Sequence, residues 1–236
     1  MITVIDLETT GIDPEKDAIV EIAALDFTPE RAITNRREHL VCPPFSVPPD
    51  ASAVHHLIDE DLAGAPPLRD VLEHYQGSCV YVSHQAEFER AFLKDLVGLS
   101  RQTQQPASWI CTYRCALRVW PEAPAHNNNT LRYMLGHANP FGIDRRTLVA
   151  HRALSDVIVT AAVFLEILKR ATWSQMQMWS NEPPLETVIR FGNKHKHKRY
   201  DEVARIDPDY LVWVRDKSDL KEGTKFSAGH WLEQAA

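Results

Sequence analysis

Two acidic residues near the start of the sequence have the spacing of a metal site. Asp6 and Glu8 stand at the end of an apolar, β-branched segment, Met1–Ile5. Residues i and i+2 of a strand point to the same face, so the two carboxylates are expected to project together. Ionised carboxylates this close raise each other's pKa unless a cation lies between them, and hard cations such as Mg²⁺ take oxygen ligands. Alone, such a pair is more often two surface acids.

Two later motifs change that interpretation. The segment Ser83–Leu93 reads SHQAEFERAFL and contains Glu89, and the segment His151–Asp156 reads HRALSD. A histidine whose pKa is near 6.5 can take a proton from water around neutral pH, which is the role expected of His151. Each residue also has a structural explanation, because His151 and Asp156 could cap or begin a helix and Glu89 could face solvent on one.

The order and spacing of these motifs resemble the DnaQ-like 3′→5′ exonucleases, in the branch called DEDDh after its four acids and one histidine. The family pattern D-x-E-T-T/C-G is matched at Asp6–Gly11, and H-x-A-x-x-D is matched at His151–Asp156. The second motif, H-N-A-x-F-D, departs at two positions, which here hold Gln85 and Glu89. The resemblance covers roughly residues 1–170. It implies an α/β fold with a ribonuclease-H-like central mixed sheet flanked by helices.

The same resemblance implies a catalytic centre and a set of substrate contacts. Asp6, Glu8, Glu89 and Asp156 would hold two Mg²⁺ ions, which Mn²⁺ could replace, with His151 as the general base. The contacts to the terminal nucleotide and the bases would come from Leu7, Thr9, Thr10, Gly11, His55, Ile58, His84, Gln85 and Phe88. For the loop and base-contacting residues among these, packing or loop structure is an equally good explanation.

The composition is that of a globular protein. The chain has 236 residues, of which 44% are hydrophobic and 25% charged, enough for one large core and a small module. No apolar run has the length of a transmembrane helix and no signal peptide is expected, which favours the cytoplasm. The net charge of −6 argues against nonspecific coating of DNA, but a nuclease needs only local positive charge. The four cysteines lack zinc-finger spacing and are expected to be buried thiols.

Apolar periodicity predicts strands mixed with helices, which favours an α/β domain with a central mixed sheet. Strands are expected at Ile2–Leu7, Ile19–Phe27, Glu38–Cys42, Cys79–Ser83 and Trp109–Thr112, the first three as an antiparallel meander. Helices or helical turns are expected at Ser52–Ile58, Asp59–Ala63, Arg69–Tyr75, Glu87–Val97, Tyr113–Trp120, Thr130–Leu135 and Asp156–Arg170. The polar segment Leu99–Gln105 is expected to be a loop.

The last quarter of the chain is expected to form a separate unit. We predict an exonuclease domain at residues 1–172, a linker at 173–184 and a small module at 185–236. The linker segment, with its Trp and Met residues, could also be a partly buried helix that ends at Pro183-Pro184.

Within the module, Phe191–Tyr200 predicts a tight β-hairpin with a basic tip that faces solvent or phosphate. In that hairpin His195 and His197 would share one face, opposite the lysines. Short helices are expected at Val203–Ile206 and Pro208–Val214. The module is similar to that of an exonuclease-X-like branch of the family, but it lacks the usual second glycine. The matching residues are Phe191, Gly192, Asp207, Pro208, Tyr210, Leu211 and Trp213.

The sequence therefore predicts a metal-dependent 3′→5′ exonuclease that acts on DNA, at single-stranded or frayed 3′ ends. An RNA-trimming exonuclease would use the same five residues and remains a competing hypothesis. A nucleic-acid-binding protein with a weakened catalytic centre is the alternative that Gln85 and Glu89 keep open. The expected partner is nucleic acid, DNA 3′ ends foremost, with no membrane partner. The sequence does not determine the oligomeric state, for which a homodimer is one option.

Overall fold

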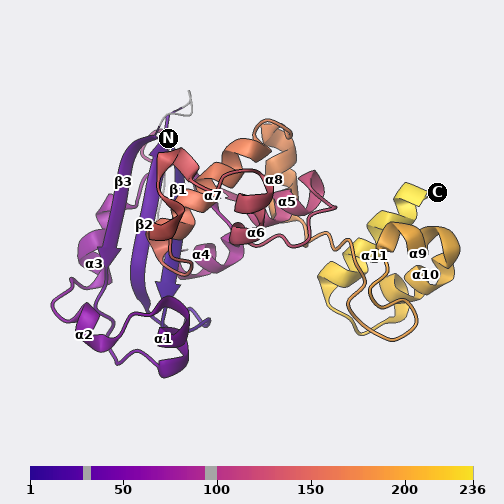
Figure 1. The fold of residues 1–236 in the computed structure, drawn as a ribbon, viewed down its shortest axis with the longest axis horizontal. Coiled ribbons are helices and arrows are strands. Elements are labelled where there is room, and N and C mark those ends of the chain that lie inside the picture. Colours follow the sequence, from indigo (N-terminus) through magenta and orange to yellow (C-terminus); the bar gives the residue numbers. More distant parts are fainter. Residues whose placement is uncertain (29–32, 94–99, 236) are drawn as a thin grey trace.

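The computed structural model describes residues 1–28, 33–93 and 100–235, and its centre is a five-stranded sheet with the order β3-β2-β1-β4-β5 (Figure 1). The strands are β1 Ile2–Thr9, β2 Ile19–Phe27, β3 Ile33–Leu40, β4 Val80–Ser83 and β5 Ser108–Cys111. β1, β2 and β3 pair antiparallel, whereas β4 lies parallel to β1 and to β5. The mixed sheet and the meander are as predicted. β3 begins five residues earlier than expected, because this edge strand is largely exposed and polar at its start.

Helices flank the sheet and continue into the C-terminal part of the chain. They are α1 Pro49–His55, α2 Asp59–Leu62, α3 Leu68–Val71, α4 Ala86–Leu93, α5 Thr112–Val119, α6 Asn128–Met134, α7 Ala153–Ile167, α8 Trp173–Asn181, α9 Tyr200–Ile206, α10 Pro208–Lys217 and α11 Glu222–Ala235. The predicted helix Arg69–Tyr75 is instead α3 followed by a short 3₁₀ turn, Leu72–His74. Residues 94–97 of the predicted helix Glu87–Val97, and residue 99 of the predicted loop, lie outside the described residues. Among the described residues, no helix has the length and apolar character needed to cross a membrane.

The two faces of β1 belong to two different cores, and this alternation places the acidic residues. Val4 packs with residues of α5 and α7 on one face, while Ile5 and Leu7 pack with α3 and the strand residues of the other face. Successive side chains of a strand point to opposite sides. Asp6 and Glu8 therefore lie on the Val4 face, which is the face that α7 covers.

Helix α8 occupies most of the segment 173–184. Residues 173–181 form this helix, with Met176 completely buried and the Ser180 hydroxyl accepting the Cys111 N–H of β5 at 2.8 Å. Thr172 caps the helix and its side chain accepts the Gln175 N–H. The helical alternative for this segment is thus confirmed for residues 173–181, whereas the division of the chain at 173–184 stays a prediction.

The predicted hairpin at Phe191–Tyr200 is also wrong. The segment forms a loop of turns, closed by a single β-bridge between Val188 and Arg199. His195 is buried, with its Nε2 2.7 Å from the Asp207 carboxylate, and Lys194 reaches the same carboxylate at 2.5 Å. The two side chains converge on one acid rather than alternating between faces. Asp207, at the start of α10, is the partner that local periodicity does not reveal.

Helix α11 was not predicted at all. Its fully buried residues, Thr224, Ser227 and Ala228, are small or polar, and the large apolar side chains that it packs against the module's core, Trp231 and Leu232, lie near its end. An apolar repeat, the main sequence signal for a helix, is therefore weak in this segment.

Candidate active site

A cleft of about 500 Å³ opens at the carboxyl ends of the parallel strands β1 and β4. This volume is within the range of small-molecule and substrate sites. The cleft is lined by Asp6, Leu7, Glu8, Thr9, Gly11, Ile12, Val54, His84, Gln85, Phe88, Glu89, Asn127, Asn128, Asn129, Ala150, His151 and Asp156. All five predicted catalytic residues are among them, although they are distant in sequence.

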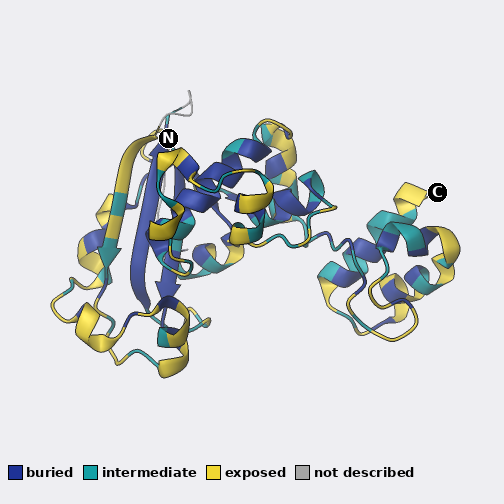
Figure 2. Cartoon of the chain, in the orientation of Figure 1, coloured by how far each residue is buried: buried dark blue, intermediate teal, exposed yellow. Residues whose placement is uncertain are grey.

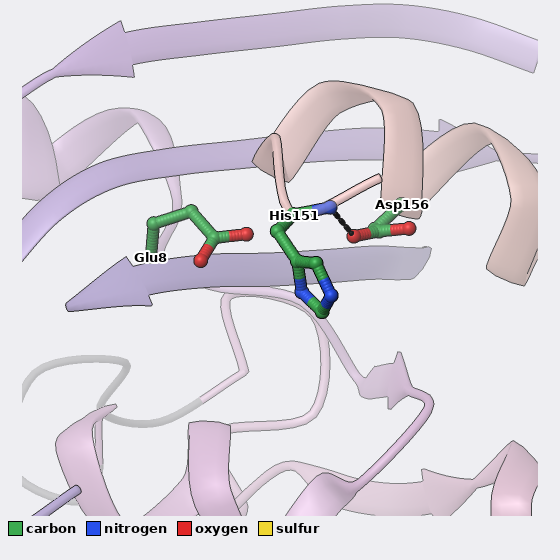
Figure 3. A group of neighbouring side chains, drawn as sticks. All are labelled: Glu8, His151 and Asp156. Atoms are coloured by element: carbon green, nitrogen blue, oxygen red, sulfur yellow. Dashed lines mark hydrogen bonds between the residues drawn. The ribbon is translucent and has the colours of Figure 1, made fainter. Parts of the chain in front are cut away.

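The catalytic candidates come from four elements. β1 supplies Asp6 and Glu8, α4 supplies Glu89, α7 supplies Asp156, and His151 stands in the turn that precedes α7. Ligand atoms of Glu8, His151 and Asp156 all lie within 4.8 Å of one another, and the Glu8 carboxylate points toward the other two (Figure 3). The His151 backbone N–H donates to Asp156 Oδ2 at 2.8 Å. On the other side of the cleft, the Ser83 hydroxyl donates to Glu89 Oε2 at 3.0 Å.

The pKa values of all four carboxyl groups are raised above their usual range. Burial, together with the charges of Asp156, Glu89 and Glu8, raises the pKa of Asp6 well above its usual value. Burial and the charge of Asp156 raise the pKa of Glu8 to about 8, and burial raises that of Glu89 to about 7. Burial likewise raises the pKa of Asp156. A group of buried acids that repel one another gains most from a nearby cation, so the donor set fits a divalent metal ion.

His84 lines the cleft, but its ring is used by the protein. Nε2 donates to the His126 carbonyl at 2.7 Å, and Nδ1 lies 3.0 Å from the Thr112 hydroxyl. Burial lowers the pKa of His84 to about 4, so the ring is neutral and Nδ1 accepts the Thr112 proton. His84 thus joins the end of β4 to α5 and to the loop before α6.

Three predicted substrate contacts do not line the cleft. Thr10 is buried and bonds to Asp17 at 3.1 Å. His55 is only 1% exposed and its Nδ1 accepts the Leu57 N–H at 3.1 Å. Ile58 is exposed in the segment between α1 and α2. The structure thus does not bring these three residues into the cleft lining, and their contacts to substrate stay predictions.

The structure also adds residues that sequence reasoning did not assign to the site. Val54, Ile12 and Ala150 bring apolar surface to the cleft, and the Asn127–Asn129 run brings amides. Ile12, in the loop between β1 and β2, is 87% exposed although it is apolar. The sequence alone does not show that this side chain lies at the cleft. The three consecutive asparagines are a visible signal in the sequence, and the structure shows that they form the start of α6, with Asn127 as its cap.

Comparison with known proteins agrees with this geometry. Residues 3–164 match the exonuclease family model RNase T. The chain belongs to this exonuclease family. It is 34% identical to Exodeoxyribonuclease 10 of Escherichia coli K12 over 99% of both chains, and 30% identical to the DNA polymerase III epsilon subunit of Treponema pallidum over 70% of this chain and 75% of the relative.

Two solved structures resemble the fold. Exonuclease X in complex with 5′ overhanging duplex DNA superposes with a TM-score of 0.61 at 33% identity, covering 77% of this chain and all of that one. E. coli Exonuclease I in complex with a dA16 oligonucleotide has a TM-score of 0.56 at 14% identity, over 75% of this chain and 42% of that one, which shows the fold alone. Exonucleases of this family typically depend on metal ions, and Glu8, His151 and Asp156 form a group that could hold one.

Glu89 departs from the family's aspartate, and its role can be tested directly. Glu89→Ala is expected to lower activity by roughly 10²-fold or more, because a group that supports transition-state charge is lost. Glu89→Asp should keep substantial activity, since it retains the carboxylate. The matched control is Glu87→Ala on the same helix, an exposed residue paired with Arg114, which should stay within about twofold of wild type. Single-turnover digestion measures all three, and full activity of Glu89→Ala would exclude Glu89 as a metal ligand.

Proposed function

We propose that this chain is a metal-dependent 3′→5′ exonuclease that releases 5′-mononucleotides from DNA, at single-stranded or frayed 3′ ends. The observation that carries the proposal is the convergence of four carboxylates, of which those of Glu8 and Glu89 are buried, with His151 in one cleft. DNA is favoured as the substrate because the relative with 34% identity is named an exodeoxyribonuclease, and the similar solved structure holds duplex DNA.

The donor set fits two Mg²⁺ ions, with Mn²⁺ as a substitute. Asp6, Glu8, Glu89 and Asp156 would hold the ions, since carboxylate oxygens are the ligands that both metals prefer. When bound, the ions would supply positive charge that stabilises the anionic phosphate of the transition state. They would also remove the repulsion that raises the pKa values of the four acids.

The chain's own residues account for the proton transfer and for substrate positioning. Water attacks the terminal phosphorus and His151 takes its proton, while the bond from phosphorus to the 3′ oxygen of the next nucleotide breaks. That oxygen takes a proton from solvent, and the products are a 5′-mononucleotide and a shortened strand. Leu7, Val54 and Phe88 offer apolar surface to the terminal nucleoside. Gln85 and Asn129 line the same cleft, and their amides would bond with the polar groups of that nucleoside.

We also propose that residues 185–235 form a small module that is distinct from the exonuclease domain at residues 1–172. The described part of this segment has its own buried core, made only of residues from Ile189 onward, and it lies apart from the sheet (Figure 2). Its loop 190–199 carries several cations. Lys194 is held by Asp207 at 2.5 Å, whereas Lys196 is exposed and Lys198 makes only a longer, solvent-exposed pair with Glu202 at 3.5 Å. Lys196 and Lys198 are therefore the better candidates for phosphate contacts.

Replacement of Lys196 and Lys198 by glutamine should weaken binding of single-stranded DNA and flatten its salt dependence. Each lost phosphate contact lowers the log–log salt slope by about 0.7, so two lost contacts would lower it by about 1.4. Lys217→Gln with Lys221→Gln, elsewhere in the module, is the control and should leave the slope unchanged. Fluorescence anisotropy with a labelled oligonucleotide, in a catalytically inactive background, measures both slopes. Equal slopes for wild type and the loop variant would exclude phosphate contacts by these lysines.

The substrate class can be tested by comparing the digestion of DNA and RNA side by side. Single-stranded DNA and RNA of the same sequence, each labelled at the 5′ end, are digested in Mg²⁺, Mn²⁺ or EDTA. The proposal expects faster shortening of DNA. Faster shortening of RNA would favour the RNA-trimming hypothesis. Tight binding with no shortening in either metal would favour a nucleic-acid-binding protein with a weakened centre, the hypothesis motivated by Gln85 and Glu89.

A further inference from the structure

Glu21 is a completely buried acid that lies outside the proposed metal-ligand set. It lies on β2 directly opposite Glu8 of β1, so both side chains are on the sheet face that α7 covers. Arg152 approaches it with two nitrogens: Nη2 lies 2.6 Å from Oε1, and Nε lies 3.1 Å from each carboxylate oxygen. The Ala153 N–H donates to Oε2 at 2.8 Å. One carboxylate of the sheet therefore binds two consecutive residues at the start of α7.

This arrangement explains why α7 begins at Ala153 rather than at Asp156, where the sequence predicted its start. The first N–H groups of a helix have no partner within the helix and need an acceptor. The capping residue, Arg152, has no side chain that could accept the bond. Glu21, more than 130 positions away in the sequence, supplies the acceptor for Ala153 instead.

His151 is held in an uncommon backbone conformation immediately before this anchored pair. Its φ is +59°, in the left-handed region that residues other than glycine rarely adopt. Such a conformation persists where the surrounding structure fixes it. On one side the His151 N–H is bonded to Asp156, and on the other Arg152 and Ala153 are bonded to Glu21. The direction of the imidazole thus depends on bonds made by its neighbours.

We propose that the ion pair between Glu21 and Arg152 is a positioning device for the catalytic base, setting the backbone from which the His151 imidazole reaches the attacking water. This inference rests on the proposed function, because it assigns the pair a role in the same reaction. Glu21 and Arg152 are positioning residues, since they act through His151. Arginine is required because its planar guanidinium binds a carboxylate through two parallel bonds, which a lysine cannot do.

The substitution that tests this proposal is Arg152→Lys. It keeps the positive charge near Glu8 and removes only the bidentate contact with the Glu21 carboxylate. The matched control is Arg37→Lys. Arg37 forms a two-pronged ion pair with Asp26, which is also buried, also on β2, and five positions further along that strand. A general effect of weakening a buried ion pair on β2 would appear in both variants. An effect on His151 would appear only in Arg152→Lys.

Both substitutions are made in wild type and in His151→Ala, and the rate is measured in single turnovers with Mg²⁺ and 5′-labelled single-stranded DNA. We expect Arg152→Lys to lower the single-turnover rate by about 10-fold in the wild-type background. A misplacement of a catalytic group by about 1 Å can lower a rate by up to about 10²-fold. In His151→Ala the same substitution should cost less than about twofold, because the group it positions is gone. Arg37→Lys should cost less than about twofold in both backgrounds. Equal losses from Arg152→Lys in both backgrounds, or a similar loss from Arg37→Lys, would overturn the proposal.

A second readout does not depend on activity. Amide hydrogen exchange of His151 and Ala153 should become faster in Arg152→Lys and remain unchanged in Arg37→Lys, because only the first loosens the anchored turn. Unchanged exchange at both amides would overturn the positioning role. If exchange becomes faster but His151→Ala is as active as wild type, the positioning of His151 stands and the proposed base is wrong. The two failures are therefore distinguishable.

Discussion

Asp6→Asn is expected to abolish hydrolysis while making the metal-free protein more stable. Asp6 lies at the centre of the acidic group, where burial and the charges of Asp156, Glu89 and Glu8 raise its pKa. An amide of the same shape removes a proposed metal ligand and one of the repelling charges together. The rate should fall by on the order of 10³-fold or more. The melting temperature in EDTA should rise by roughly 2–4 °C for each kcal/mol of relieved repulsion.

The stability of the metal-free protein should fall as the pH rises, because the site then gains repelling negative charges. Glu8 has an ordinary pKa of 4.5 and a pKa of about 8 in the folded chain. Between these values the folded state binds more protons than the unfolded state, so Glu8 makes stability fall as pH rises from 4.5 to 8. Melting curves in EDTA at pH 5.5 and 8.0 should show this fall in wild type and a smaller one in Asp6→Asn. Added Mg²⁺ should reverse it. A wild-type protein that is more stable in EDTA at pH 8.0 would contradict the assigned electrostatics.

His151→Ala should lower the single-turnover rate by roughly 10²–10⁴-fold, the usual contribution of a general base. Affinity for Mn²⁺ should change little, because the proposed ligands are the four acids. The control is His137→Ala, a histidine paired with Glu166 near the other end of α7, which should retain the wild-type rate. Calorimetric titration with Mn²⁺ checks the second part. A large loss of Mn²⁺ binding would make His151 a metal ligand, as its closeness to Glu8 and Asp156 permits.

The elements that carry the acids were predictable because strong local patterns mark them. β1 and β2 begin in apolar, β-branched segments, so their starts and their antiparallel pairing follow from the sequence, although β1 continues to Thr9, two residues beyond its predicted end. The convergence of Asp6, Glu8, His151 and Asp156 followed from family resemblance and not from periodicity. Placement of Glu89 in the same cleft depends on α4, whose position after β4 the resemblance also implied.

The features that were missed depend on partners far away in the sequence. The start of α7 is determined by Glu21, and the loop 190–199 is shaped by the bonds of His195 and Lys194 to Asp207. Neither partner is visible in a local window. The burial of His55, a predicted substrate contact, likewise appears only in the structure. Tertiary bonds override local patterns in each case.

The most direct test of the central claim follows the ends of a single oligonucleotide. Single-stranded DNA labelled at the 5′ end is incubated with the protein in Mg²⁺, and a second sample is labelled at the 3′ end. The account predicts a ladder that shortens one nucleotide at a time from the first substrate and immediate release of a labelled 5′-mononucleotide from the second, with neither product in EDTA or with Asp6→Asn. Immediate release of a labelled nucleotide from the 5′-labelled substrate, or equal digestion in EDTA, would contradict it.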